Sequence, residues 1–191
     1  MIENGTRARR RQEILKAATE EFSRCGFEGT RIDAVAKRAG IGKSTVYEYY
    51  PSKEELLYAV CTMVVSEIVE RMREALDAPL PLHDLLIRSL RCMCDLHHRF
   101  CTAVPTLSEN TEVKENLEEF ASQFCRETAQ MLTATLEKAA QNGEIEPRAN
   151  YNTAALLMLS TASPVYWEGV RAGMTSYEEA AAFFLRALSA N

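Results

Sequence analysis

The sequence predicts an all-α fold, with an N-terminal three-helix head built on a helix-turn-helix and a larger helical body behind it. Apolar residues recur at intervals of three and four, as they do on one face of a helix. Proline, glycine and capping residues stand between these periodic stretches, where helices end and begin. Hardly any segment shows the polar–apolar alternation of a strand. Composition is ordinary for a globular protein, with 47% hydrophobic and 26% charged residues in a chain of 191.

The segment from Gly26 to Leu57 predicts two short helices joined by a tight turn, with a new helix just beyond. Thr30 is a good N-cap and Asp33 follows three residues later, so the first of these helices is expected to open with a capping box. Gly40 stands where that helix must stop, and glycine adopts the left-handed conformation of such a stop without strain.

The second short helix presents an unusual outer surface. Ile41 and Val46 supply apolar contacts beneath the turn, and Pro51 ends the helix. The residues left facing outward are Lys43, Ser44, Thr45, Tyr47, Glu48 and Tyr49. Cations and hydroxyls there can reach phosphates and base edges. This layout is typical of a helix-turn-helix that reads DNA.

The other helices are expected between identifiable stops. Ser52 and Glu55, and later Ser176 and Glu179, have the spacing of a capping box. The expected ranges are 10–24 with a stop at Gly26, 52–76, 82–103 ended by Pro105, 111–141, 150–172 with a kink at Pro164, and 176–190.

The charge is divided unevenly along the chain. Residues 1–53 carry 11 Lys/Arg against 7 Asp/Glu, a balance of +4, whereas the rest carries 11 against 20, a balance of −9. A basic head on an acidic body is expected when only the head meets phosphate. We therefore predict a DNA-binding domain over residues 1–53 and a regulatory domain for ligand binding and dimerisation over residues 54–191.

These residues resemble the DNA-binding domain of the tetracycline-repressor-like (TetR) family of transcription regulators, from Ile14 to about Ala59. The matching elements are Ile14-Leu15-Lys16-Ala17-Ala18, Phe22, Gly26-Phe27, Thr30, Ile32, Val35-Ala36, Ala39-Gly40, Ser44-Thr45-Val46-Tyr47-Glu48-Tyr49-Tyr50 and Lys53-Glu54-Glu55-Leu56. Gly42 and Ser44 depart from the usual Ser and Gly of the family. Because glycine is an acceptable cap, the departures bear on base preference and not on the fold.

The resemblance implies which residues contact DNA: Thr30, Arg31, Lys43, Ser44, Thr45, Tyr47, Tyr49 and Lys53. Lys43 and Arg31 are expected at base edges, since both can donate to guanine O6 and N7. Thr45, Tyr47 and Lys53 are expected at phosphates, Tyr49 at either. Tyr50 is expected to pack in the core of the head. For the basic tract Arg7 to Arg11, both a solvated arm and a phosphate contact stay open.

The last two expected helices are rich in small and apolar residues over most of their surface, and such helices need burial on more than one side. This favours a homodimer through these helices, which the resemblance also implies; burial within one subunit is the alternative. A two-fold dimer would bring two recognition helices to the half-sites of a palindromic operator in double-stranded DNA.

The resemblance implies a small-molecule effector, which would act through the long helix beginning at Ser52. Aromatic residues of the body that could line its pocket are Phe100, Phe120, Phe124, Tyr166 and Trp167. The same residues could simply form core.

The segment from Cys92 to Cys101 gathers cysteines and histidines. On a helix Cys94, His97 or His98, and Cys101 would share a face, but a structural zinc site wants four ligands. We therefore favour the interpretation that these side chains pack in the core. Two alternatives remain: a regulator that senses a metal or the thiol redox state through this cluster, and an enzyme that uses it. No nucleophile motif or phosphate loop is found, so no enzyme, metal or cofactor is expected.

The N-terminus has no apolar region of a signal peptide, and no apolar run reaches the roughly 18 residues of a membrane helix. We therefore expect a cytoplasmic protein with reduced cysteines and no membrane partner. The expected function is that of a homodimeric, ligand-released repressor; the operator, the effector and the sign of regulation are open.

Overall fold

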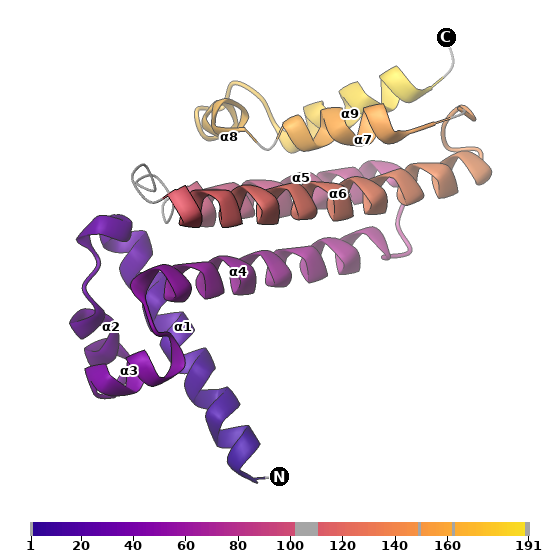
Figure 1. The fold of residues 1–191 in the computed structure, drawn as a ribbon. Coiled ribbons are helices and arrows are strands. Elements are labelled where there is room, and N and C mark those ends of the chain that lie inside the picture. The colour runs from indigo at the N-terminus through magenta and orange to yellow at the C-terminus, as the bar shows by residue number, and fades with distance from the viewer. Residues whose placement is uncertain (1, 102–110, 149, 162, 190–191) are drawn as a thin grey trace. The chain divides into compact units, whose positions relative to one another are not determined.

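The computed structural model describes residues 2–101, 111–148, 150–161 and 163–189, with side chains for 6–95, 115, 118–148, 150–161, 163 and 165–189. Within these residues the chain is helical and contains no strand, which confirms the predicted fold class (Figure 1). The helices are α1 (Ile2–Gly29), α2 (Ile32–Ala39), α3 (Lys43–Tyr49), α4 (Lys53–Leu76), α5 (Leu82–Cys101), α6 (Thr111–Gln141), α7 (Asn152–Ser160), α8 (Pro164–Arg171) and α9 (Tyr177–Leu188).

The chain divides into two compact units. The first contains residues 1–65 and 98–120, and the second contains residues 66–97 and 121–191. Three long helices, α4, α5 and α6, contribute to both. The domain boundary expected between residues 53 and 54 stays a prediction.

The first unit holds a small apolar core beneath α1, α2 and α3. Phe22 of α1, Val35 of α2 and Val46 of α3 are buried, and the Phe22 and Phe27 rings stack with centroids 6.0 Å apart. Helices α2 and α3 each contribute an apolar side to this shared core. Their opposite, polar sides therefore face the solvent.

The end of α1 differs from the prediction. Instead of stopping at Gly26, α1 kinks there, with φ 69° and ψ 176°, and continues to Gly29. Only glycine adopts this conformation without strain. The predicted capping box at Thr30 is wrong, because α2 begins at Ile32 with Arg31 as its N-cap. The Thr30 hydroxyl instead bonds carbonyls near the kink, donating to Gly26 O at 2.7 Å and Glu21 O at 3.1 Å.

The turn between α2 and α3 follows the prediction. Gly40 is left-handed, with φ 67°, and the amide of Ile41 donates to the Ala36 carbonyl at 3.0 Å, closing the end of α2. The next helix also starts as expected, since the Glu55 amide donates to Ser52 Oγ at 3.1 Å.

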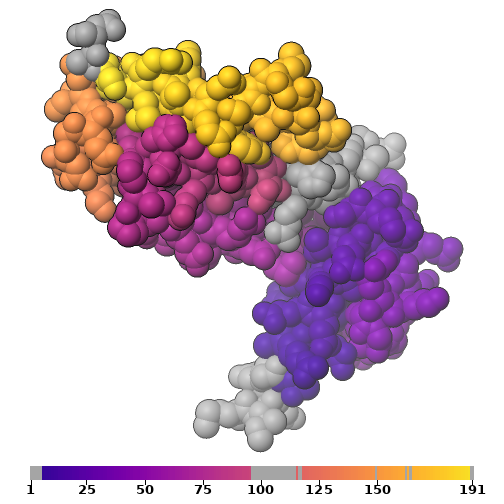
Figure 2. Space-filling model, turned by 180° about the vertical axis from the view of Figure 1, so that it is seen from behind, coloured from indigo at the N-terminus to yellow at the C-terminus, as the bar shows by residue number. Residues whose placement is uncertain are grey.

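The second unit has a larger apolar core, to which Leu86 of α5, Leu136 of α6 and Ala181 of α9 contribute buried side chains. The C-terminal helices lie directly against the segment that contains α5 (Figure 2). Arg91 of α5 pairs with Glu178 of α9 at 3.3 Å. One side chain of this core is unusual: Thr128 of α6 is fully buried, and its Oγ1 has no hydrogen-bond partner in the described part of the chain.

The helix expected over residues 150–172 is two helices, so the predicted kink at Pro164 is wrong. Ser163 caps α8 by accepting from the Tyr166 amide at 3.2 Å, and Pro164 is the first residue of α8. Proline is tolerated there because backbone N–H groups in the first turn of a helix have no acceptor within the helix, so the N–H that proline lacks is not missed. The capping box of Ser176 and Glu179 at the start of α9 is confirmed in both of its hydrogen bonds.

Among the described residues no helix is long and apolar enough to cross a membrane.

Candidate nucleic-acid interface

Helix α3 presents its polar side outward, as the sequence predicts. Buried Val46 anchors it, and Lys43, Ser44 and Glu48 are exposed. Helix α3 has seven residues, and one of them, Tyr47, leaves its large ring 41% exposed to solvent. Thr45 and Tyr49 are half-buried. This side can therefore bring a cation, hydroxyls and a phenol to one surface.

Lys43, the expected base reader, lies beside a carboxylate of the preceding helix. Its Nζ is 3.1 Å from Asp33 Oδ2, and both side chains are about half exposed, at 51% and 53%. Exposed ion pairs contribute at most about 1 kcal/mol, so Lys43 can leave Asp33 for a guanine or a phosphate. Arg31 is also exposed, at the start of α2.

The basic tract of α1 lies beside the end of α3. The Arg7 guanidinium stands 5.8 Å from the centre of the Tyr49 ring. Arg11 Nε donates to Tyr50 Oη at 3.1 Å, and buried Tyr50 packs in the core as predicted. Helix α1 thus places cations next to the surface formed by α3.

Two predicted contacts are already used inside the first unit. Lys53 Nζ stands 4.4 Å from the centre of the Phe27 ring and donates to the Glu28 carbonyl at 3.3 Å. Thr30 is only 3% exposed and bonded to the α1 backbone. We therefore leave the Thr30 side chain out of the DNA-contacting set, because a buried hydroxyl cannot reach a phosphate.

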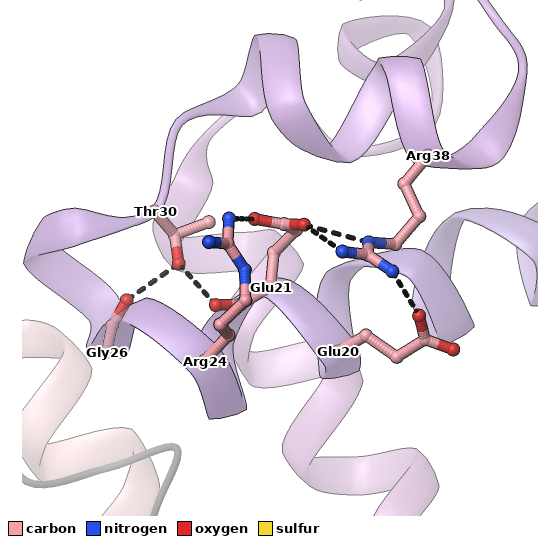
Figure 3. A network of polar contacts seen from close by, with 6 residues as sticks. All are labelled: Glu20, Glu21, Arg24, Gly26, Thr30 and Arg38. Atoms are coloured by element: carbon pink, nitrogen blue, oxygen red, sulfur yellow. Dashed lines mark hydrogen bonds and ion pairs between the residues drawn. The ribbon is translucent and has the colours of Figure 1, made fainter.

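A buried carboxylate ties α2 to α1, a feature that the sequence analysis missed. Glu21 of α1 is 3% exposed and accepts from Arg24 Nη2 at 2.7 Å and Arg38 Nε at 2.8 Å (Figure 3). Arg38 of α2 also donates through Nη1 to Glu20 Oε2 at 2.7 Å. The Arg24 and Arg38 guanidiniums hold the pKa of Glu21 below its ordinary value of 4.5.

Arg38 is thereby paired within the first unit, although its side chain is 39% exposed. A cation within a helix-turn-helix is expected to meet phosphate, but this guanidinium bonds two carboxylates of α1. The only signal in the sequence was the acidic pair Glu20-Glu21 in the first helix. We assign Arg38 the role of positioning α2, and through the turn α3, against α1.

The aromatic residues expected to line a ligand pocket are engaged in local packing. Phe120 lies edge-on to Tyr58, with ring centroids 6.2 Å apart, and Phe124 is buried. Tyr166 lies edge-on to Tyr177 at 6.5 Å, and Arg171 covers the Trp167 ring at 4.9 Å. The side chain of Phe100 lies outside the described residues. The second unit contains a cavity of about 610 Å³, and none of the four residues whose side chains are described lines it.

In the Cys/His cluster, from Cys92 to Cys101, the structure describes side chains only as far as Asp95. Cys92 and Cys94 are buried, and burial raises the pKa of both thiols, which favours the protonated thiol over the thiolate. The side chains of His97, His98 and Cys101 lie outside the described residues. Where side chains are described, no three potential metal ligands lie together.

Known proteins resemble this chain both locally and over most of its length. The sequence profile of the bacterial regulatory proteins of the tetR family matches residues 14–60. The uncharacterized HTH-type transcriptional regulator YhgD of Bacillus subtilis is 29% identical over 139 residues, 72% of this chain and 73% of that protein. The HTH-type transcriptional activator FasR of Mycolicibacterium smegmatis is 28% identical over 162 residues, 84% of this chain and 73% of the activator.

Solved structures share the fold. The transcriptional regulator FadR of Bacillus subtilis, solved in complex with stearoyl-CoA, superimposes with a TM-score of 0.65 and 19% identity. The superposition covers 94% of this chain and 97% of FadR. At this identity the likeness concerns the fold.

Proposed function

This chain belongs to the tetR family of bacterial transcriptional regulators, and on that premise we propose that it binds a palindromic operator as a homodimer and is released by a small-molecule effector. The observation that carries the proposal is the outward side of α3, a polar surface with cations of α1 and α2 beside it.

We assign the DNA contacts to the accessible part of that surface. Lys43 and Arg31 are placed at base edges, where either can donate to guanine. Ser44, Thr45 and Tyr47 are placed at phosphates, with Tyr49 able to serve either. Lys53 remains a phosphate contact in this proposal, since its amine can exchange the Glu28 carbonyl for a phosphate oxygen. Arg7 of the basic tract joins this set, because it lies over Tyr49.

The proposal of a homodimer rests on the C-terminal helices. Leu156 and Leu157 of α7 and Phe183 of α9 are 54%, 57% and 63% exposed, although all three are large and apolar. Val165 of α8 is 82% exposed. Large exposed apolar side chains on neighbouring helices mark a surface that another chain covers. A two-fold partner would present two α3 helices to DNA about one helical turn apart.

The effector class is proposed from the relatives. FadR of Bacillus subtilis was solved with stearoyl-CoA, and a fatty acid metabolism regulator of the same species is 22% identical to this chain over 154 residues. We propose a fatty-acyl compound as effector. The relative FasR is named an activator, whereas we propose that this protein is a repressor. Transcription from an identified operator, measured with and without the protein, distinguishes the two, because a repressor lowers it and an activator raises it.

The first experiment is selection of random duplex DNA by the purified protein, with sequencing of the retained fraction at moderate salt. A palindrome with half-sites about one turn apart supports both sequence-specific binding and a two-fold dimer. Salt-sensitive retention without any enriched sequence would reduce the function to an electrostatic contact and overturn the proposal.

A further inference from the structure

We propose that Asp33 is a specificity-determining residue, which positions the Lys43 ammonium so that it contacts base edges in preference to phosphates. The inference rests on the proposed function, because it concerns how Lys43 chooses between two parts of the DNA. It adds to that function a role for a negative charge on a surface that binds a polyanion.

Asp33 and Lys43 lie at the starts of the two helices of the helix-turn-helix. Asp33 is the second residue of α2, and Lys43 is the first residue of α3. Asp33 Oδ2 lies 3.1 Å from Lys43 Nζ, and the two side chains are 53% and 51% exposed. The pair therefore bridges the turn at the surface, where both groups are accessible to a ligand. A carboxylate at such a place needs a reason, since it repels the phosphates of DNA.

A lysine by itself selects poorly between phosphates and bases. Its ammonium is a compact charge on a flexible stem, whereas the planar fork of an arginine such as Arg31 matches the two acceptors of guanine in shape. Phosphates are charged and are present in every sequence and register of the duplex. A free Lys43 would therefore strengthen the binding of any sequence.

The carboxylate of Asp33 changes this balance. An ammonium has three donors, so Lys43 can keep one hydrogen bond to Asp33 and direct the other two to O6 and N7 of a guanine. Guanine is neutral and adds no repulsion against Asp33. A phosphate brings a second negative charge to the same ammonium, so it must displace Asp33 or lie beside it. The pair therefore penalises phosphate contact more than base contact, by up to about fivefold for an exposed ion pair.

A purely structural role for Asp33 is the alternative. Asp33 is the acidic residue in the first turn of α2, where the helix dipole stabilises a carboxylate. Asp33→Asn removes the charge and keeps the shape, and Asp33→Glu keeps the charge. A change in selectivity that appears in Asp33→Asn and is restored in Asp33→Glu supports the proposal. A change that Asp33→Glu does not restore reflects the fold of α2 and overturns it.

The test is a fluorescence anisotropy titration of the full-length protein, on the selected operator and on a scrambled duplex of the same length and composition. We expect Asp33→Asn to bind the scrambled duplex about fivefold more tightly and the operator within about twofold of the wild type, so the ratio of the two affinities falls. On the scrambled duplex, the slope of log affinity against log salt should steepen by about one, because the freed Lys43 adds one phosphate contact.

Two controls separate the ion pair from charge alone. Glu28→Gln removes one negative charge from an exposed position of the same unit and should leave the affinity ratio unchanged. In a Lys43→Ala background, Asp33→Asn should change binding of the scrambled duplex by less than about twofold, since no ammonium is left to release. Equal tightening with and without Lys43 would show that Asp33 only repels DNA, which overturns the positioning role.

Failure of this inference and failure of the proposed function give different results. The scrambled duplex requires no operator, so an unchanged affinity and salt slope in Asp33→Asn overturn the role of Asp33, whatever sequence the selection yields. A wild type that enriches no sequence overturns the proposed function instead, while titrations of the scrambled duplex still show whether Asp33 restrains Lys43.

Discussion

Helices α1–α3 and helices α7–α9 expose opposite kinds of side chain. On α1–α3 most of the exposed residues are charged or hydroxylated, and a buried carboxylate with two arginines joins α1 to α2. On α7–α9 large apolar residues are accessible, among them Leu156, Leu157 and Phe183. The first surface suits a charged polymer in water. The second surface leaves large apolar side chains exposed to water, although helices that are apolar on most of their surface are normally buried on more than one side.

The difference teaches where each part obtains its stability. Helices α2 and α3 are short, and helices α1–α3 share few buried side chains, so single core residues and polar contacts matter more there. The C-terminal helices rest on the larger core of the second unit, and we propose that they are completed by a second chain.

The largest effect is expected from Phe22→Ala. Phe22 is fully buried against Phe27, and removing such a ring costs about 3–5 kcal/mol. Amide hydrogen exchange should show opening of α1–α3 with the second unit still protected. Leu136→Ala is the counterpart in the second unit, where Leu136 is fully buried, and it should deprotect α6 first. If Phe22→Ala opened both units equally, the head would not be separately stabilised.

Phe183→Glu is expected to break the proposed dimer. A central aromatic residue of an interface contributes about 2 kcal/mol or more, so the dissociation constant should rise at least about 30-fold. Sedimentation measures the mass. Gln130→Glu adds the same charge at an exposed position of α6 and should leave the mass unchanged. A dimer that survives Phe183→Glu would show that the interface lies elsewhere.

Lys43→Ala is expected to change base preference, with a loss of about 1–3 kcal/mol at one matched base pair. Binding to a panel of operator variants gives the measurement. Asp33→Ala is the partner variant: it frees Lys43 and removes a negative charge, so binding should be unchanged or tighter. A uniform loss over all sequences in Lys43→Ala would identify a phosphate contact.

Glu21→Gln is expected to change how stability depends on pH. Arg24 and Arg38 lower the pKa of Glu21 below 4.5 in the folded protein. The carboxylate therefore stabilises the fold above about pH 4.5, and this contribution is lost as the pH falls through the lowered folded pKa. Thermal unfolding from about pH 6 to about pH 3 should show a smaller decline for Glu21→Gln than for the wild type. Equal declines would contradict the role of Glu21.

The smallest effect is expected from Thr128→Val, which replaces a buried hydroxyl without a hydrogen-bond partner in the described residues by a methyl group of the same shape. Stability should rise by about 1 kcal/mol or less in urea unfolding. Thr135→Val on the same helix is the control, because the Thr135 hydroxyl donates to the Met131 carbonyl at 3.0 Å. A loss of stability at position 128 similar to that at 135 would show that Thr128 is bonded.

The sequence by itself determined the features that depend on neighbouring residues. Periodicity and local caps predicted the bounds of α4, α6 and α9 within about two residues, because a helix begins and ends on groups three or four positions apart. The same local logic predicted the left-handed turn at Gly40 and the outward side of α3. The resemblance to the tetR family rested on this segment as well.

Only the tertiary structure decided what depends on residues far apart in the chain. Thr30 is an excellent N-cap by its neighbours, but the carbonyls at the Gly26 kink accept its hydroxyl instead. Arg38 is a free cation in the sequence, whereas the fold pairs it with Glu20 and Glu21. The cavity between α4, α5 and α6 likewise has no local signal, since its walls come from segments about 50 residues apart. Such pairings are set by how helices pack, and packing is not encoded in the spacing within any one helix.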